Sequence, residues 1–303
     1  MRNIHILNPA AGMAKANYKV PENVEVYETK GPRDMENFIR RTASEDPSVH
    51  FTVYGGDGTV NEAVNGIMTA GNEAIEKCVL SVVPKGSGND YVRNFSDTEK
   101  FNGKVDVLKI NDRYGINSVN IGFDCDVVVE TDKLKRHRLT SGSMGYIVGV
   151  IKVLFRKLGS KMQIEITEKN GKIHNFDGEF LLTAVGNGKY CGGGFKFAPA
   201  AVLDDGSFDA LVVKKMGRFT FLKLVGAYRS GTHVDVERCE PRGKFKSEIS
   251  YFKCKKMTVK NIKRYGIDGE IFDGESVEIT VIPRALNIEM PPFDLTKTAN
   301  KKK

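Results

Sequence analysis

The chain has 303 residues, of which 40% are hydrophobic and 28% are charged, and its formal net charge is +8. This composition supports a packed core, and the absence of any run of about 18 apolar residues excludes a membrane-spanning helix. The basic excess favours anionic partners, such as nucleotide phosphates or an acidic membrane surface.

The cysteine pattern argues against both a disulfide framework and a zinc site. The five cysteines are scattered, odd in number and without a CxxC pair. The N-terminus shows no signal-peptide pattern. Together these features predict a cytoplasmic protein in a reducing compartment.

The first third of the chain alternates apolar runs with a helical pattern. Buried strands are predicted at 3–8, 24–29, 49–54 and 78–83, and a helix with Pro at its first position at 32–45. Further helices are expected after Gly58 and Gly86. This alternation predicts a parallel sheet covered by helices, in a Rossmann-like α/β domain.

After about residue 160 the pattern becomes β-rich. Residues 161–176 alternate apolar and polar side chains around Asn170-Gly171, which is a strong hairpin signal. Further strands are expected at 179–187, 207–213, 247–254, 256–262 and 276–282, with one helix at 218–231. We therefore predict a β-sandwich as the second domain, with domains at 1–121 and 122–303 and the last ~15 residues returning to the first domain.

The segment 132–160 joins a basic cluster to an apolar helical stripe. It is interpreted either as a core-facing helix with a solvated basic end or as a surface that rests on anionic lipid.

Glycine-rich turns follow the predicted strands, and acidic residues stand among them. The clearest is VYGGDGTVNEAVNG at 53–66, where Asp57 lies between glycines at the start of a helix. Helix N-termini favour anions, so an aspartate there is expected only if a metal cation bridges it to phosphates. Related turns are NPAAG at 8–12, PKGSGND at 84–90 and YGIDGE at 265–270.

In this order the motifs resemble the diacylglycerol kinase catalytic-domain family, and most closely its soluble bacterial lipid kinases. The resemblance runs from LNPAAG to VIPRALNIEMP and is carried by GGDGTVNEAVNG, PKGSGNDYVRNF, NIGFDCDVV, APAAVLDDGSFDALVV and IDGEIFDGE. It implies a first domain with the three-layer fold of NAD kinases and phosphofructokinases, a β-sandwich second domain, and ATP bound between them.

The resemblance also assigns residues to roles. It implies that Asp57 and Asp124 organise catalytic Mg²⁺ and that Glu270 is the general base, although Asp124 is also compatible with a structural cap. Ser87 stands where the family usually has Thr, so the hydroxyl is kept. The implied nucleotide contacts are Asn8, Pro9, Ala10, Ala11, Gly12, Thr29, Gly55, Gly56, Asp57, Gly58, Thr59, Val60, Asn61 and Ser87.

A second, structural Mg²⁺ site is implied at Val202, Asp205 and Ser207, where serine replaces an apolar residue of the family. The alternative for Asp205-Gly206 is an ordinary hairpin turn. Asp90 is equally compatible with capping a helix and with a catalytic role.

These features predict an ATP- and Mg²⁺-dependent lipid kinase, with diacylglycerol as the expected acceptor. The alternatives are another lipid alcohol, a soluble acceptor such as NAD, or a regulator that binds ATP without turnover. We expect peripheral contact with the inner face of the membrane, and an exposed strand edge would allow a homodimer. No nucleic-acid partner is expected, because the basic residues are diffuse.

Overall fold

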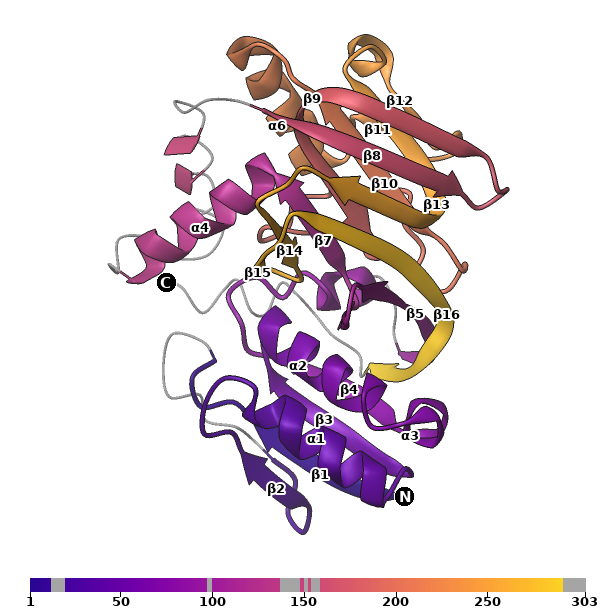
Figure 1. The fold of residues 1–303 in the computed structure, drawn as a ribbon. Coiled ribbons are helices and arrows are strands. Elements are labelled where there is room, and N and C mark those ends of the chain that lie inside the picture. The colour runs from indigo at the N-terminus through magenta and orange to yellow at the C-terminus, as the bar shows by residue number, and fades with distance from the viewer. Residues whose placement is uncertain (12–19, 97–99, 137–147, 150–151, 154–158, 291–303) are drawn as a thin grey trace.

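The computed structural model forms two lobes joined along one continuous sheet (Figure 1). It describes residues 1–11, 20–96, 100–136, 148–149, 152–153 and 159–290. Most of the segment 132–160, including the predicted apolar helical stripe, therefore lies outside the described residues.

The first lobe is the predicted α/β domain. Its strands run parallel in the order β2–β1–β3–β4, and α1 and α2 pack side by side on one face of the sheet (Figure 1). The elements are β1 (Arg2–Leu7), β2 (Glu25–Glu28), α1 (Asp34–Glu45), β3 (Val49–Gly55), α2 (Asp57–Met68), α3 (Asn72–Lys77) and β4 (Val79–Pro84). All four strands predicted here are present, but β2 is an exposed edge strand and not a buried one.

Two helix predictions in this lobe are wrong in detail. Helix α1 begins at Asp34 rather than at Pro32, because Arg33 takes a left-handed backbone with φ of 63°. No α-helix follows Gly86 directly. The Asn89 side chain bonds both the N–H and the carbonyl of Gly86 and closes a turn, which is followed by the short 3₁₀ helix η1 (Val92–Phe95).

The second lobe is β-rich, as predicted. Its elements are β5 (Phe101–Ile110), β6 (Arg113–Gly115), β7 (Ser118–Gly122), α4 (Phe123–Arg136), β8 (Ser160–Glu168), β9 (Ile173–Gly186), β10 (Phe208–Lys214), α6 (Arg218–Ser230), β11 (Val234–Asp235), β12 (Glu240–Pro241), η2 (Gly243–Phe245), β13 (Ile249–Lys260), β14 (Arg264–Ile267), β15 (Glu270–Asp273) and β16 (Ser276–Met290). The hairpin at Asn170-Gly171 is confirmed, since β8 and β9 pair across it and Gly171 has φ of 90°. The strands predicted at 247–254 and 256–262 are one strand, β13, whose pairing with β8 shifts register between Cys254 and Lys256.

Strand β16 joins the lobes. Its first half pairs with β13, and its second half reaches β4 through Asn287 opposite Val79 and Ile288 opposite Leu80. The chain thus returns to the first lobe by residue 287, while residues 291–303 lie outside the described part. The two lobes therefore share a strand.

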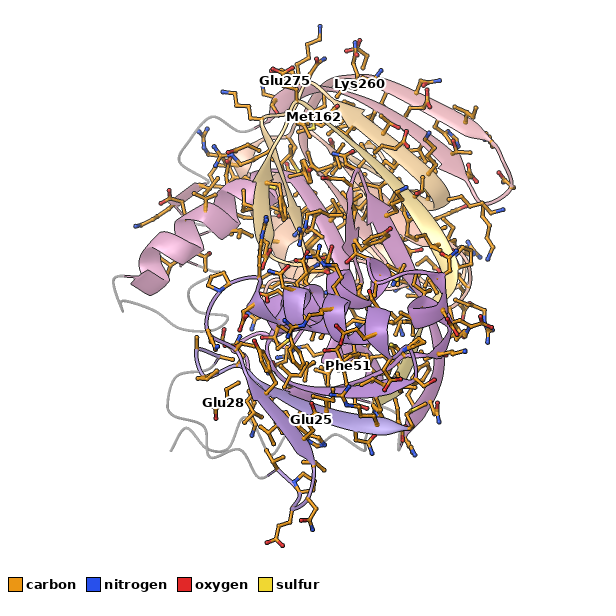
Figure 2. The ribbon with its side chains drawn as sticks, turned by 60° about the horizontal axis from the view of Figure 1, so that its bottom comes forward. Glu25, Glu28, Phe51, Met162, Lys260 and Glu275 are labelled. Atoms are coloured by element: carbon orange, nitrogen blue, oxygen red, sulfur yellow. The ribbon has the colours of Figure 1, made fainter. Side chains whose placement is uncertain are left out.

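Each lobe has its own apolar core. Phe51 lies inside the first lobe, whose β2 edge carries Glu25 and Glu28, whereas Lys260 and Glu275 lie at the far end of the second lobe (Figure 2). Within the described residues, no helix combines the length and the apolar character needed to cross a bilayer.

Candidate active site

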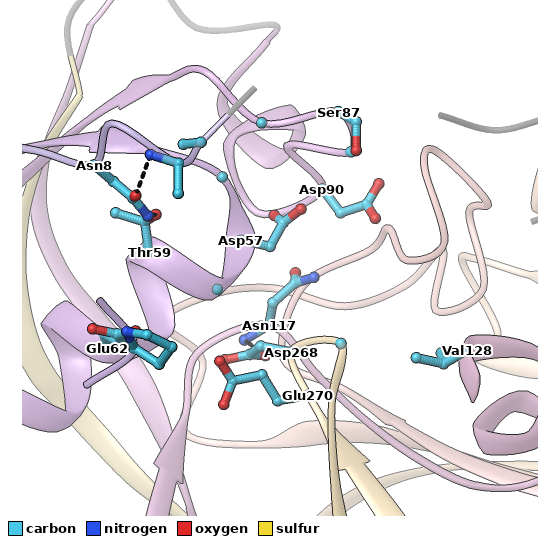
Figure 3. Close-up of a pocket in the computed structure, with 18 of the residues that line it drawn as sticks. Asn8, Asp57, Thr59, Glu62, Ser87, Asp90, Asn117, Val128, Asp268 and Glu270 are labelled. Carbon is cyan, nitrogen blue, oxygen red and sulfur yellow. Dashed lines mark hydrogen bonds between the residues drawn. The ribbon is translucent and has the colours of Figure 1, made fainter. Parts of the chain in front are cut away.

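A cavity of about 730 Å³ opens between the two lobes, and residues of both lobes line it. Asp57 enters from the start of α2 in the first lobe, and Glu270 enters from the start of β15 in the second (Figure 3). An added Cβ on Gly58 would lie 3.6 Å from Glu270 Oε1. The two carboxylates that the sequence singled out thus face one shared space.

The floor of this cavity is built from two glycine turns in close contact. An added Cβ on Gly56 would lie 2.9 Å from Gly86 Cα, and one on Gly86 would lie 2.5 Å from Gly56 Cα. Neither position therefore tolerates a side chain without backbone movement. Because α2 begins here, its unpaired N–H groups can hold an anion such as a phosphate.

The NPAAG loop is tied to the same turn. Asn8 Nδ2 donates to Thr59 Oγ1 over 3.0 Å, and Asn8 Oδ1 accepts the Ala10 N–H over 3.0 Å (Figure 3). Asn8 therefore sets the position of the loop relative to the start of α2.

Most of the predicted nucleotide contacts line the cavity. Those that do are Asn8, Pro9, Ala10, Ala11, Thr29, Gly56, Asp57, Gly58, Thr59 and Ser87. Gly12 lies outside the described residues. Gly55, Val60 and Asn61 are not among the residues that line the cavity, and nucleotide contact by them stays a prediction. Gly55 ends β3, Val60 is buried in the core, and the Asn61 amide is bonded to Asp268 and the Tyr114 carbonyl.

Asp57 has a second carboxylate beside it, that of Asp90. An added Cβ on Gly88 would lie 2.9 Å from Asp57 Oδ2 and 3.5 Å from Asp90 Oδ2. Desolvation by the surrounding protein and the negative charge of Asp90 raise the pKa of Asp57 to about 7. Desolvation raises the pKa of Asp90 as well. Two carboxylates this close disfavour each other's charge unless a cation joins them.

This pair fits a divalent cation. Asp90 is 7% exposed, and its Oδ1 accepts no hydrogen bond within the described part of the chain, with Arg93 Nε 3.6 Å away. Its other oxygen accepts the Gly193 N–H. No group of three or more metal-ligating side chains occurs among the described residues, so the ion would complete its shell with water and phosphate oxygens, as Mg²⁺ usually does.

Glu270 has the environment of a proton acceptor. Burial and the nearby Glu62 carboxylate raise the pKa of Glu270 above its ordinary value. A base with a raised pKa is better matched to proton transfer near neutral pH.

The turn that carries Glu270 is held by its neighbour Asp268. Asp268 Oδ1 accepts the N–H groups of Asn117 and Ser118, and Oδ2 accepts the Ile116 N–H and the Asn61 side chain, all at 2.8–2.9 Å. A fully bonded buried carboxylate has little freedom to move. Asp268 therefore orients Glu270 toward α2.

The structure does not bring Asp124 into this cavity. Asp124 lies in the first turn of α4, is buried, and accepts a hydrogen bond from the Tyr228 hydroxyl over 3.3 Å. It lines a second, small apolar cavity between α4 and α6. The carboxylate that lies beside Asp57 is that of Asp90, and the predicted role of Asp124 in catalysis stays a prediction.

The side chains around the implied structural Mg²⁺ site include a lysine. Lys253 Nζ donates to the Ala200 carbonyl over 3.0 Å and lies 3.1 Å from both Asp205 Oδ2 and Asp209 Oδ1. The other Asp205 oxygen accepts the Ser207 N–H and hydroxyl, and Lys169 bonds the Asp205 carbonyl. Val202 is exposed at the surface. The Lys253 ammonium group thus neutralises Asp205 and Asp209 and would repel a cation bound at Asp205, so the structural Mg²⁺ ion stays a prediction that these side chains do not favour.

We expect Lys253→Met to lower the free energy of unfolding by about 2–3 kcal/mol, because the buried Asp209 would lose its cationic partner and keep only the Tyr251 hydroxyl. Urea unfolding measures the change. The matched control on the same strand is Lys256→Met, whose exposed ion pair with Glu278 is worth less than about 1 kcal/mol. Equal effects of the two substitutions would contradict the assignment.

Some cavity residues were given no individual role from the sequence, although Gly86, Gly88, Asn120, Val128 and Gly269 lie within quoted motifs. The lining also includes Lys30, Gly31, Pro32, Glu62, Gly86, Gly88, Asn117, Ser118, Asn120, Val128, Thr131, Cys191, Gly192, Gly193 and Gly269. The run CGGG at 191–194 was the available signal, since three consecutive glycines between strands indicate close backbone approach.

A glycine-built anion cradle, faced by a carboxylate pair on one side and a base on the other, defines a phosphotransferase site. Two protein-family models match the chain. The diacylglycerol kinase catalytic domain matches residues 4–120, and the YegS C-terminal NAD kinase beta sandwich-like domain matches residues 117–290. The chain therefore belongs to the YegS-like family of lipid kinases, which are transferases.

Individual relatives agree with this assignment. The chain is 27% identical over 271 residues to a "Probable lipid kinase YegS-like" of Shewanella frigidimarina, covering 86% of this chain and 82% of the relative. It is 28% identical over 250 residues to a protein of the same name from Pectobacterium atrosepticum, covering 78% and 77%. The fold is similar to the crystal structure of a diacylglycerol kinase from Bacillus anthracis strain Sterne, with a TM-score of 0.65, 20% identity and 97% of each chain covered.

Proposed function

We propose that the protein transfers the γ-phosphate of ATP to the hydroxyl of diacylglycerol, yielding phosphatidate, in a reaction that requires Mg²⁺. The observation that carries the proposal is the placement of the Asp57–Asp90 pair opposite Glu270 across a glycine cradle. The names of the relatives support a lipid acceptor.

The residues of the first lobe would bind the nucleotide. The backbone around Gly56 and Gly58 faces the phosphates, and the loop fixed by Asn8 closes one side of the cavity. Asp57 and Asp90 would hold Mg²⁺, which when bound neutralises charge on the transferring phosphoryl group.

Glu270 would act from the second lobe. The acceptor oxygen forms a bond to the γ-phosphorus while the bond from that phosphorus to the β,γ-bridging oxygen of ATP breaks, and ADP leaves. The proton of the attacking hydroxyl passes to the Glu270 carboxylate. Asp268 holds the turn in place so that this carboxylate faces the first lobe.

The acceptor is tested with labelled ATP and a panel of hydroxyl compounds. We expect phosphorylation of diacylglycerol dispersed with anionic phospholipid, well above that of ceramide, sphingosine, phosphatidylglycerol and NAD. Preferential labelling of another lipid would change the acceptor but keep the lipid kinase. Labelling of NAD alone would overturn the lipid assignment, and ATP binding without any transfer would indicate a regulator.

A further inference from the structure

The β14–β15 hairpin, which carries Glu270, has an aromatic side chain on the same face as that carboxylate. Phe272 follows Glu270 by two positions on β15, and side chains two residues apart point to the same face of a strand. The Phe272 ring stacks on Tyr265 of β14 with ring centroids 5.8 Å apart. A contact that holds the Phe272 ring therefore also restricts the direction in which Glu270 can point.

Arg113, at the start of β6, joins this ring to the first lobe. Its guanidinium carbon lies 5.5 Å from the centroid of the Phe272 ring, within the range of a cation–π interaction. Its Nη2 donates to Glu36 Oε2 over 3.0 Å, and Glu36 stands in the first turn of α1. One side chain thus contacts both the strand that carries Glu270 and a helix of the first lobe.

The ion pair between Arg113 and Glu36 is shielded from water. Their side chains are 17% and 15% exposed, whereas those of Arg2 and Glu25, which pair within the first lobe, are each 44% exposed. Arg113 Nε is also buried and donates no hydrogen bond among the described residues. Loss of one partner of a shielded pair leaves the other charge uncompensated, so this contact is costly to break.

The backbone of β6 is fixed on helix α2. The Tyr114 N–H donates to Asn65 Oδ1 over 3.1 Å, and the Tyr114 carbonyl accepts the side-chain amides of Asn61 and Asn65. Helix α2 begins at Asp57. Arg113 therefore extends from a strand whose position relative to the Asp57 turn is set by hydrogen bonds.

Arg113 also contributes to the charge around Glu270. The charged residues that act on Glu270 are Glu62 on α2, Arg113 on β6, Arg33 before α1, and Asp268 in the turn. Desolvation and the Glu62 charge raise the pKa of Glu270, whereas the Arg113 charge lowers it. Helix α4, which also packs on β15, contributes the uncharged side chains of Val128 and Thr131 to the cavity wall. Arg113 thus favours the ionised carboxylate, which is the form that accepts a proton.

We propose that Arg113 is a positioning residue for phosphoryl transfer, because its contacts with Glu36 and Phe272 fix strand β15 against helix α1 and hold Glu270 toward the start of α2. The role of Glu270 as the base rests on the proposed function, whereas the contact between the lobes does not. Asp268 holds the turn of the same hairpin, and Arg113 acts at a second point, on the strand that follows the turn.

Arg113→Met is expected to lower the maximal rate of transfer from ATP to diacylglycerol by about tenfold to a hundredfold, since a displacement of about 1 Å at the reacting groups can cost that much. Equilibrium ATP binding should stay within about twofold, because Arg113 does not line the cavity. Glu36→Gln should also lower the rate, and the double variant should be no slower than Arg113→Met, because both substitutions break one contact. The matched control is Arg2→Met, which removes an arginine–glutamate pair within the first lobe and should keep the wild-type rate.

The pH profile separates this role from a general loss of structure. As pH is lowered, the activity of Arg113→Met should fall at a higher pH than that of the wild type, because the missing positive charge no longer lowers the pKa of Glu270. Arg113→Lys keeps the charge but not the planar pairing with Glu36, so it should keep the wild-type midpoint and recover only part of the rate. A slower Arg113→Met enzyme with the wild-type midpoint, or equal losses of rate and ATP affinity, would overturn the proposal.

Hydrogen exchange tests the contact without catalysis. In the full chain without ATP, the backbone amides of residues 264–273 should exchange about tenfold faster in Arg113→Met than in the wild type or in Arg2→Met. In a protein that phosphorylates no lipid, this faster exchange would support the contact while the proposed function fails. In an active lipid kinase, equal rates and equal exchange in Arg113→Met and Arg2→Met would overturn the proposal while the proposed function stands.

Discussion

Asp57→Asn is expected to lower phosphoryl transfer from ATP by at least about 10³-fold. Charge neutralisation at a transferring phosphoryl group is worth several kcal/mol, and each 1.36 kcal/mol is a factor of ten. The amide keeps the shape of the side chain and its bond from the Tyr91 N–H, but it removes the negative charge. Labelled transfer at saturating ATP and lipid measures the effect.

The same substitution has an expected effect on stability that separates function from folding. Because the pKa of Asp57 is raised to about 7, the charged form is disfavoured in the metal-free fold. Metal-free wild-type protein should therefore lose stability as pH rises from about 4 through about 7, whereas Asp57→Asn should lose less.

Asp273→Asn, an exposed aspartate on β15, is the matched control for activity. Transfer by Asp57→Asn within about tenfold of the wild type would refute the role of Asp57.

Glu270→Gln is expected to lower the maximal rate of transfer by about 10²–10⁴-fold, the usual contribution of a general base. ATP affinity should change little, because Glu270 comes from the second lobe and the nucleotide cradle comes from the first. A loss of rate with equal nucleotide affinity, measured by steady-state kinetics and by equilibrium ATP binding, distinguishes a base from a binding residue.

The pH profile gives an independent test of Glu270. Only the ionised carboxylate accepts a proton, so activity should fall as pH is lowered through the pKa of Glu270, which burial and Glu62 raise above the usual value for glutamate. The residual activity of Glu270→Gln should no longer show this fall at low pH. Glu275→Gln, exposed near the end of the same hairpin, should retain both rate and profile. A full-rate Glu270→Gln enzyme would leave the general base unassigned.

The implied structural metal site at Val202, Asp205 and Ser207 allows a further check with magnesium. In the Asp57→Asn background the cleft pair is disabled, so added Mg²⁺ should shift the thermal midpoint by less than about 1 °C, because Lys253 already neutralises Asp205 and Asp209. A larger, saturable stabilisation would show that Mg²⁺ binds at a structural site near Asp205.

Local signals were sufficient for much of the fold. Strands β1, β3 and β4 of the first lobe followed from short apolar runs, because a parallel strand inside a covered sheet needs such a run. The hairpin at Asn170-Gly171 followed from a turn whose backbone angles few other residue pairs adopt. The glycine turns were identified because backbone-to-backbone packing, such as that of Gly56 on Gly86, leaves no room for a Cβ.

The partners of each carboxylate were not determined locally. Asp57, Asp90, Asp124 and Asp205 all stand in motifs of similar appearance, yet the first two face one cavity, the third bonds Tyr228 beneath α6, and the fourth pairs with Lys253. The partner residues Tyr228 and Lys253 lie at least 48 positions away in the chain, at distances that only sheet pairing and helix packing set.

The sequence by itself therefore determined the two-lobe α/β and β-rich plan, the glycine turns and the acidic residues at which chemistry was expected, because backbone conformation and burial act within a few residues. Only the tertiary structure decided which carboxylates share a cavity, which are neutralised by a lysine, and which arginine joins α1 to the strand that carries Glu270. Those outcomes depend on charge and contact between segments far apart in the chain, which sheet pairing and helix packing bring together.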